Sequence, residues 1–302
     1  MRSEFARALI ERSASVELVF LTGDVGFMAF ELLAAKLGER FINAGVAEQN
    51  MISVAGALSR QGFEVWVYSI APFCYARPFE QIRNDVAFHG LRVKLVGNGG
   101  GYGYGVMGPT HHAIEDYGVL STLPNMRIFA PVFDDDVASV VAAAAAADGP
   151  CYVRLGTSHA PAHGAVPPYE PWRKLTTGGG PLVLAVGALA ASYVDAFASI
   201  PLAERPNLWA VAELPLALCP PPGEMLAQID DGNAVLVAED HVRTGSFGAD
   251  LALHLAETGR TPREFRHVCA RRHDYGVHGS QAFLHELSGL DAQSIVRAGS
   301  GR

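Results

Sequence analysis

The sequence predicts an α/β protein of two doubly wound domains, in which helices cover both faces of mainly parallel sheets. Two observations lead to this prediction. Short apolar runs alternate with segments of helical period along most of the chain. A stretch at residues 159–180 is rich in proline and glycine, has no apolar period and separates two such series, as a linker does. We therefore predict domains at residues 1–158 and 181–302, which the length of 302 residues allows.

The first series starts with an amphipathic helix and continues with short apolar strands, each followed by a turn or a helix. Its last helix is capped by Asp134 or Asp135 and ends before Gly149-Pro150. The predicted elements are a helix at 2–13, strands at 16–22 and 41–44, a helix from 47, a strand at 64–69, a helix at 79–88, strands at 92–97 and 127–130, a helix at 135–147 and a strand at 151–155.

The second series is shorter and repeats the alternation of apolar strands with helical segments, which predicts a smaller doubly wound domain. Its predicted elements are strands at 181–186, 207–211 and 234–238, a helix at 248–258 and a final strand at 264–270.

Composition excludes several classes of protein. Apolar residues make up 49% of the chain and charged residues 18%, as in ordinary globular proteins. The net charge of −8 argues against a nucleic-acid partner, and no apolar run is long enough to span a bilayer. The four cysteines are scattered without a CxxC pair, which predicts reduced thiols in a cytoplasmic protein and no zinc site. The N-terminal segment reads as a helix and not as a signal peptide.

A single acid opens the helix that follows the strand at 41–44. Glu48 lies in the first turn, where the helix dipole favours a carboxylate. Met51, Val54 and Leu58 recur at helical spacing, so one face of this helix packs inward. On these grounds alone Glu48 reads as an ordinary solvated first-turn acid.

The run Ala44-Gly-Val-Ala-Glu48-Gln-Asn-Met51 resembles the motif in the pyrimidine-binding domain of transketolases and deoxyxylulose phosphate synthases. The resemblance implies thiamine diphosphate as the cofactor. It also implies that Glu48 hydrogen-bonds a ring nitrogen of the aminopyrimidine, so that the imino tautomer can remove the thiazolium proton. Asp24 and Val25, which follow the first strand, are further expected contacts of the cofactor.

A second matching stretch runs from Ser69 to Arg83 and follows the strand at 64–69. In the resembling families an aromatic side chain from this loop stacks on the aminopyrimidine, and Phe73 matches its position. A flat apolar ring stacks without competing for hydrogen bonds. Tyr75 is the alternative stacking residue, and the alternative for Phe73 itself is a core position at a strand-to-helix corner.

The segment Gly108-Pro-Thr-His111-His112 resembles a Gly-Pro-Thr-His-Gln loop whose histidine reaches the substrate and the reactive cofactor carbon. His111 takes that position, and His112 replaces the glutamine as a further expected substrate contact. An imidazole can pass protons near neutral pH. The glycine-rich loop at 97–105 lacks the pattern of a dinucleotide fingerprint and predicts a close approach of backbone to a ligand or another chain.

The chain departs from transketolase at positions that contact substrate. Met107 stands where sugar-transferring members have an aspartate that reads a donor hydroxyl, and Gly99 stands where they have a phosphate-binding histidine. Arg2 and Arg154 remain as basic matches; each either binds phosphate through its bidentate fork or is an exposed surface arginine. We therefore expect an altered donor, or an acceptor with a bulkier group than a simple phosphate.

The second half of the chain resembles the C-terminal domain of transketolases. The matching segments are Val237-Ala-Glu-Asp-His241, Gly245-Ser-Phe-Gly, His278-Gly-Ser-Gln-Ala and Leu290-Asp-Ala-Gln-Ser-Ile.

The domain that holds the cofactor's diphosphate has no match in this sequence. It carries a Gly-Asp-Gly motif and a downstream asparagine that bind a divalent metal, and Asp230-Asp-Gly-Asn233 and Gly23-Asp24-Val lack the right flanks. We predict no metal site in this chain. Mg²⁺ or Ca²⁺ would be held mainly by a separate diphosphate-binding subunit, in a complex with two copies of each chain.

The resemblance thus implies the β-type subunit of a split transketolase, which moves a two-carbon ketol unit from a ketose donor to an aldehyde or sugar acceptor. A subunit that uses pyruvate or another 2-oxoacid is the alternative, favoured by the loss of the donor-reading aspartate, whereas the Gly-Pro-Thr-His segment favours transketolase. A non-catalytic regulatory homologue is a third interpretation, against which the joint presence of Glu48, Phe73 and His111 argues.

Overall fold

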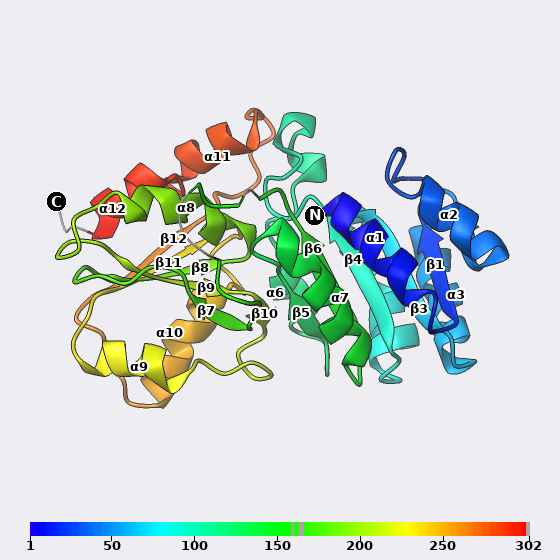
Figure 1. Cartoon of the computed structure of the whole chain (residues 1–302), viewed down its shortest axis with the longest axis horizontal. Helices are drawn as coiled ribbons and strands as arrows, with labels where there is room; N and C mark the ends of the chain where they lie inside the picture. The colour runs from blue at the N-terminus through cyan, green and yellow to red at the C-terminus, as the bar shows by residue number, and fades with distance from the viewer. Residues whose placement is uncertain (159, 163–165, 300–302) are drawn as a thin grey trace.

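Two helix-covered sheets lie side by side along the long axis of the molecule (Figure 1). The structure, a computed structural model, describes residues 1–158, 160–162 and 166–299. Within these residues the sheets are parallel except at two short edge pairings, β5 (Arg127–Phe129) with β10 (Glu213–Leu214) and β7 (Trp172–Lys174) with β9 (Asn207–Val211). The predicted α/β class with mainly parallel sheets is therefore confirmed.

The first sheet has seven strands in the order β10-β5-β6-β4-β3-β1-β2. Its parallel strands are buried almost throughout, because helices cover both faces. The strands are β1 (Leu18–Thr22), β2 (Phe41–Asn43), β3 (Glu64–Ile70), β4 (Val93–Asn98), β5 (Arg127–Phe129), β6 (Cys151–Leu155) and β10 (Glu213–Leu214).

Alternate strand residues of the first sheet point to opposite faces, as the pleat requires. Phe20 and Trp66 pack under α1, α2 and α7, whereas Val19 and Val65 pack under α3, α4, η2 and α6. The helices and helical turns are α1 (Arg2–Arg12), α2 (Glu31–Leu37), η1 (Gly38–Arg40), α3 (Glu48–Arg60), α4 (Ala71–Tyr75), α5 (Phe79–Gln81), the π-helical η2 (Ile82–Ala87), η3 (Gly105–Met107), η4 (Pro109–His111), α6 (Asp116–Leu120), η5 (Asp134–Asp136) and α7 (Val137–Ala146).

The second sheet has five strands in the order β12-β11-β8-β9-β7. α8 and α12 pack on one face, and α9 and α10 on the other. Its elements are β7 (Trp172–Lys174), β8 (Leu182–Val186), α8 (Ala188–Ala198), β9 (Asn207–Val211), α9 (Gly223–Asp230), β11 (Val235–Glu239), α10 (Phe247–Glu257), β12 (Phe265–Cys269), α11 (Gln281–Ser288) and α12 (Ala292–Gly299).

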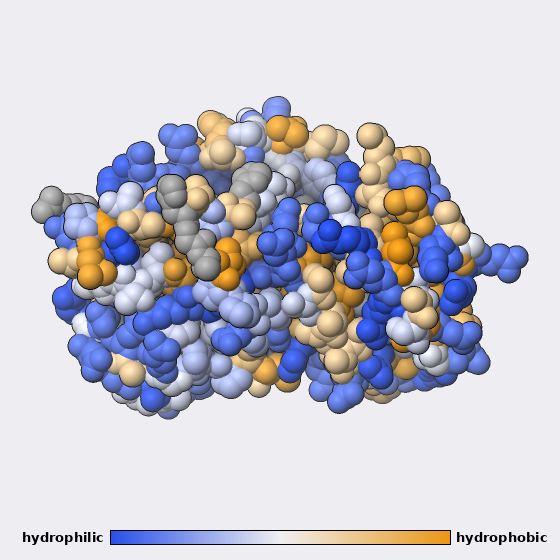
Figure 2. Space-filling view, in the orientation of Figure 1, coloured by the Kyte–Doolittle hydropathy of each residue, from blue (hydrophilic) through white to orange (hydrophobic). Residues whose placement is uncertain are grey.

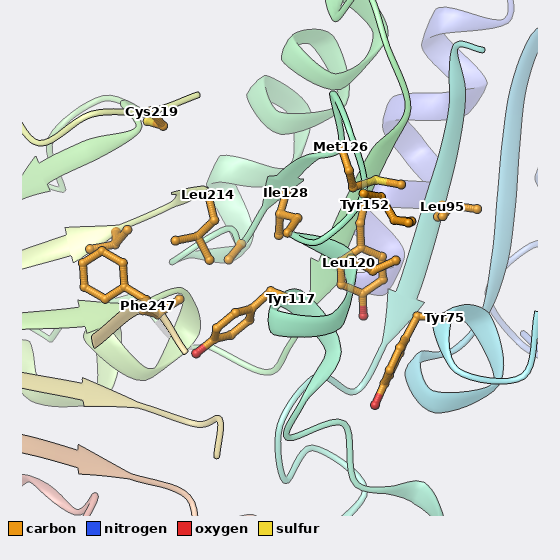
Figure 3. Packing of buried hydrophobic residues seen from close by; sticks show 14 of the residues in the cluster. Tyr75, Leu95, Tyr117, Leu120, Met126, Ile128, Tyr152, Leu214, Cys219 and Phe247 are labelled. Carbon is orange, nitrogen blue, oxygen red and sulfur yellow. The ribbon is translucent and has the colours of Figure 1, made fainter. Parts of the chain in front are cut away.

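One hydrophobic core runs across the boundary between the two sheets. Figure 3 shows Phe247 and Leu214 from the second half of the chain approaching Tyr117 and Ile128, which belong to the same buried cluster. Apolar burial drives this association, so the two units pack as one body in the described structure.

The boundary is less clean in the structure than the sequence predicts. β7 lies inside the predicted linker 159–180, where the buried Trp172 packs on Phe247 with ring centroids 5.7 Å apart. β10 belongs to the predicted domain 181–302 but pairs with β5 in the first sheet. Part of the predicted linker, at residues 159 and 163–165, lies outside the described residues. The division into 1–158, 159–180 and 181–302 stays a prediction.

None of the helices in the described part of the chain is long and apolar enough to cross a membrane.

Candidate active site

The predicted site residues follow the carboxyl ends of neighbouring parallel strands in the first sheet. Asp24 and Val25 come after β1, Glu48 after β2, Phe73 after β3 and the loop with His111 after β4. The strands β2, β1, β3 and β4 are adjacent in this order, so their carboxyl ends share one edge of the sheet. Ligands of open α/β sheets bind at this edge.

Glu48 is the first residue of α3, and only 2% of its surface is exposed. Arg77 Nη1 donates to Glu48 Oε2 over 2.6 Å. A Cβ added at Gly23 would stand 3.5 Å from Glu48 Oε1 and 3.5 Å from Ser69 Oγ, so the carboxyl group and the Ser69 hydroxyl both lie close to Gly23. The hydroxyl of Ser69 is buried without a hydrogen-bond partner in the described structure. Glu48 is therefore not a solvated first-turn acid.

Phe73 lies in α4, and its ring contacts both His111 and Arg77, the hydrogen-bond partner of Glu48. The guanidinium carbon of Arg77 lies 4.4 Å from the centroid of the Phe73 ring, within cation–π range. The His111 ring meets Phe73 edge to face, with centroids 5.2 Å apart. Glu48, Phe73, Arg77 and His111 thus form one connected group, which we call the Glu48 cluster.

Arg77 is the member of the Glu48 cluster that sequence reasoning missed. The signal was present, because Arg77 comes four residues after Phe73 in the same matching stretch. Its partner could not be read from the sequence, since Glu48 is 29 residues away.

Tyr75 does not join the cluster. It is 1% exposed and belongs to the hydrophobic core, where Figure 3 shows it together with other buried side chains. Burial, with the nearby carboxylates of Asp116 and Glu115, raises the pKa of Tyr75. Phe73, half-buried beside His111, is the better placed of the two candidate stacking residues.

His111 and Met107 lie in two short helical turns separated by Gly108. Gly108 has φ 81°, a conformation that favours glycine. Met107 ends η3 and is 56% exposed, so its thioether is open to solvent. His111 ends η4, and its Nδ1 lies 2.9 Å from Thr110 Oγ1.

His112 is buried, unlike His111. It packs edge to face on Tyr102, with centroids 5.1 Å apart, and stacks on His273 at 6.2 Å. Burial lowers the pKa of His112. These contacts support a packing role between the loop and the second half of the chain better than the predicted contact with substrate.

Asp24 and Val25 form the turn after β1. Asp24 has φ 57°, and its Oδ1 accepts a hydrogen bond from Asn43 Nδ2 over 2.8 Å. The Val25 carbonyl accepts from Thr22 Oγ1 over 2.8 Å. Both residues line a mostly apolar hollow of about 160 Å³ next to α2.

The two predicted phosphate-binding arginines differ. Arg2 is exposed and lines a cavity of about 440 Å³ together with Asn98 and Tyr104. Arg154 is only 8% exposed, and its Nε donates to Asp116 Oδ2 over 2.8 Å. Its Nη2 donates to the carbonyl of Asp240, so Arg154 bridges the two halves of the chain. It is neither a surface arginine nor a free phosphate ligand in this structure.

Comparison with known proteins identifies the family. Residues 7–162 match the model for the transketolase pyrimidine-binding domain. The chain is 31% identical over 262 residues to one subunit of the apulose-4-phosphate transketolase of Actinobacillus succinogenes, a match that covers 85% of this chain and 83% of the relative. The chain belongs to the transketolase family.

Two further transketolases match over nearly the whole chain. A putative transketolase C-terminal section from Methanocaldococcus jannaschii is 30% identical, over 98% of this chain and 94% of that protein. A solved structure of a split-gene transketolase, an inactive beta4 tetramer, is 30% identical, with a TM-score of 0.84 over 99% of this chain and 97% of the other. The family prediction made from Glu48 and its surroundings is therefore confirmed.

A transketolase pyrimidine-binding domain implies thiamine diphosphate, and the Glu48 cluster fits an aminopyrimidine. The cluster offers a buried carboxyl group that can share a proton with a ring nitrogen, and an aromatic ring on which the pyrimidine can stack. The unpartnered Ser69 hydroxyl beside Glu48 supplies a further hydrogen-bonding group. For a metal, no group of three or more His, Cys, Asp or Glu side chains with suitable geometry occurs among the described residues.

Proposed function

We propose that this chain is the β-type subunit of a split, thiamine diphosphate-dependent transketolase and acts with a separate diphosphate-binding subunit. One observation carries the proposal. The chain belongs to the transketolase family, and its buried Glu48 lies with Phe73 and His111 in one cluster at the carboxyl edge of the sheet.

Each residue of the cluster has a role in this proposal. Glu48 shares a proton with the aminopyrimidine, and its burial keeps water from competing for that hydrogen bond. Phe73 orients the ring by stacking. His111, at the mouth of the cluster, holds or accepts a proton at the hydroxyl of the substrate. When bound, the cofactor would supply carbanion stabilisation for the cleavage and formation of carbon–carbon bonds.

An exposed apolar surface beside the cluster supports a partner subunit. Phe27 is 76% exposed, Met28 92%, Leu32 77% and Val46 75%, and we call these four residues the α2 patch. Figure 2 shows hydrophobic surface over the region of α2. Large exposed apolar side chains that adjoin a site mark protein interfaces. We propose that the partner covers this patch, holds the diphosphate through Mg²⁺ or Ca²⁺, and assembles with two copies of each chain.

We propose the substrates from the family to which the chain belongs, and the loop around Met107 bears on the choice of donor. The donor in this proposal is a ketose that yields a two-carbon ketol unit, and the acceptor is an aldehyde or sugar. Met107 presents no carboxylate to a donor hydroxyl, which is the observation that favours a 2-oxoacid donor as the second candidate.

Co-expression with a separately encoded diphosphate-binding subunit tests the proposal. We expect calorimetry to find tight thiamine diphosphate binding to the complex, and weak binding or none to this chain alone. Ketol transfer from ketose phosphates and turnover of 2-oxoacids are then measured on the complex, with Met107→Asp as the variant that should shift preference toward ketoses. Micromolar affinity of the isolated chain for thiamine diphosphate overturns the split-subunit proposal, and a complex that binds no cofactor overturns the transketolase activity.

A further inference from the structure

We propose that Arg77 is a stand-in for the aminopyrimidine, holding Glu48 and Phe73 in the cofactor-free chain until the cofactor displaces it. The inference rests on the proposed function and concerns the same site. It assigns to Arg77 control of how fast and how tightly the cofactor binds.

Arg77 already makes the two contacts expected of the ring. Its Nη1 donates to Glu48 Oε2 over 2.6 Å, as a protonated ring nitrogen would. Its guanidinium carbon lies 4.4 Å from the centroid of Phe73, where a stacked ring would lie. A guanidinium is planar, delocalised and rich in N–H donors, so it resembles an aminopyrimidine in shape and in hydrogen bonding.

Arg77 also controls access to the carboxylate. Glu48 is 2% exposed, whereas the Arg77 side chain is 41% exposed. Gly23 lies close to the carboxyl group, since a Cβ at Gly23 would stand 3.5 Å from Glu48 Oε1. The guanidinium therefore holds Glu48 Oε2, and a ring that bonds to this oxygen has to take its place.

The fold permits the exchange. Arg77 follows the end of α4, and within the described part of the chain its side chain hydrogen-bonds Glu48 alone, so its long stem can turn into water without breaking a helix. A buried carboxylate without a partner is costly, so Arg77 keeps Glu48 compensated while no cofactor is present. Arg77 and the cofactor therefore compete for Glu48. If the Arg77-bound form dominates about tenfold, the apparent dissociation constant of the cofactor rises about tenfold.

The test compares Arg77→Gln with Arg83→Gln. Arg83 is an exposed arginine of the same segment whose Nε donates to the neighbouring Asn84, so it is a matched control. Association of thiamine diphosphate with the assembled complex is followed by stopped-flow fluorescence. Binding of 4-amino-5-hydroxymethyl-2-methylpyrimidine to the isolated chain is followed by NMR titration, which needs no partner and no turnover.

We expect Arg77→Gln to bind the aminopyrimidine fragment about tenfold more tightly and to take up thiamine diphosphate faster, with Arg83→Gln unchanged. Arg77→Lys keeps the charge but lacks the planar fork, so its affinity for the fragment should lie between those of wild type and Arg77→Gln. It serves as the second variant if Arg77→Gln is poorly folded. Equal or weaker fragment binding by both Arg77 variants overturns the inference, since Arg77 then does not occupy the place of the ring. Failure of the wild-type complex to bind thiamine diphosphate, with tighter fragment binding retained in Arg77→Gln, overturns the proposed function alone.

Discussion

Two buried glutamates of this chain differ in how completely they are bonded. Glu239, at the end of β11, is 0% exposed and accepts hydrogen bonds from the Tyr117 hydroxyl, from the backbone of Phe247 and Gly248, and from His267 Nε2 at 2.6 Å. Among the described residues, Glu48 has one side-chain donor, the exposed Arg77, and lies beside an unpartnered hydroxyl. A fully bonded carboxylate holds a fold together, whereas one held by a single movable partner can exchange it for a ligand.

The surroundings of the two glutamates show the same contrast. Tyr117, which donates to Glu239, stacks on His241 with centroids 4.0 Å apart, and Gly118 N donates to His241 Nε2 over 3.2 Å. These contacts tie α6 of the first sheet to β11 of the second. Both glutamates lie in segments that resemble family motifs, so a motif match alone does not tell a reactive acid from a structural one.

The largest expected effect is the loss of cofactor activation in Glu48→Gln. The amide keeps the shape of the side chain but cannot share the proton, so exchange of the thiazolium proton in the assembled complex should slow about 10²- to 10⁴-fold. Exchange is measured by quenched-flow NMR in deuterated buffer. Glu239→Gln is the control and should change exchange by only a few fold. An unchanged exchange rate of the thiazolium proton in Glu48→Gln would mean that Glu48 has only a structural role.

Removal of the structural carboxylate should unfold the protein more easily. Glu239→Ala leaves His267, Tyr117 and two backbone N–H groups buried without their acceptor, at a cost of about 3–5 kcal/mol in the free energy of unfolding. Urea denaturation measures it. The matched control is Glu264→Ala, which breaks an ion pair with Arg266 whose side chains are 37% and 47% exposed, and which should cost less than about 1 kcal/mol. Equal costs for the two variants would contradict the comparison.

The α2 patch gives a third, smaller effect, on assembly and not on folding. A charge in the centre of an apolar interface costs about 2 kcal/mol, so Leu32→Glu should weaken association with the diphosphate-binding subunit about 30-fold. Leu253→Glu, on α10 of the second sheet and 58% exposed, is the control. Interferometry with the partner immobilised measures both. Weakening by Leu253→Glu alone would place the interface elsewhere.

The strands were the most predictable part of the fold. β9 matches its predicted range 207–211, because a continuous buried apolar run leaves little freedom in its ends. β10 was not predicted, since a two-residue strand is defined by its pairing with β5, far earlier in the chain, and not by its own pattern. β7 was not predicted either, because it is a short edge strand inside a proline-rich stretch and is defined by its pairing with β9.

Candidate site residues could be predicted where they lie in a local motif. The surroundings of a residue could not be predicted where they depend on partners far away in the sequence. The structure places Glu48, Phe73 and His111, which lie in three local motifs, in one cluster. Arg154 was expected at a phosphate or at the surface, but Asp116, which is 38 residues away and on a helix that packs under the same strands, binds it in the interior. The roles of Glu48, Phe73 and His111 stay predictions until the variants are measured.

The smallest expected effect is a pH dependence at the boundary of the two halves, where His273 Nε2 lies 3.0 Å from Glu115 Oε2. The hydrogen bond and charge of Glu115 raise the pKa of His273 from 6.5, so its contribution to stability is complete below 6.5 and is lost as pH rises through the raised pKa. Burial tends to raise the pKa of Glu115, but the hydrogen bond and charge of His273 outweigh burial and lower this pKa below 4.5. The contribution of Glu115 to stability is therefore lost only as pH falls through the lowered pKa. The pair should therefore stabilise the fold most between pH 4.5 and 6.5.

Because these side chains are 29% and 36% exposed, solvent screens them and the effect should stay below about 1 kcal/mol. The measurement is the difference in free energy of unfolding between wild type and His273→Gln, at pH 5.5 and at pH 8.5. We expect the difference to be larger at pH 5.5, whereas His278→Gln, at an exposed histidine of the same loop, should show no such change. If the difference instead grew with pH, His273 would be neutral in the folded chain. The contact between His273 and Glu115 would then be a hydrogen bond without an ionic component, like a buried hydrogen bond of Glu239, and not an exposed ion pair.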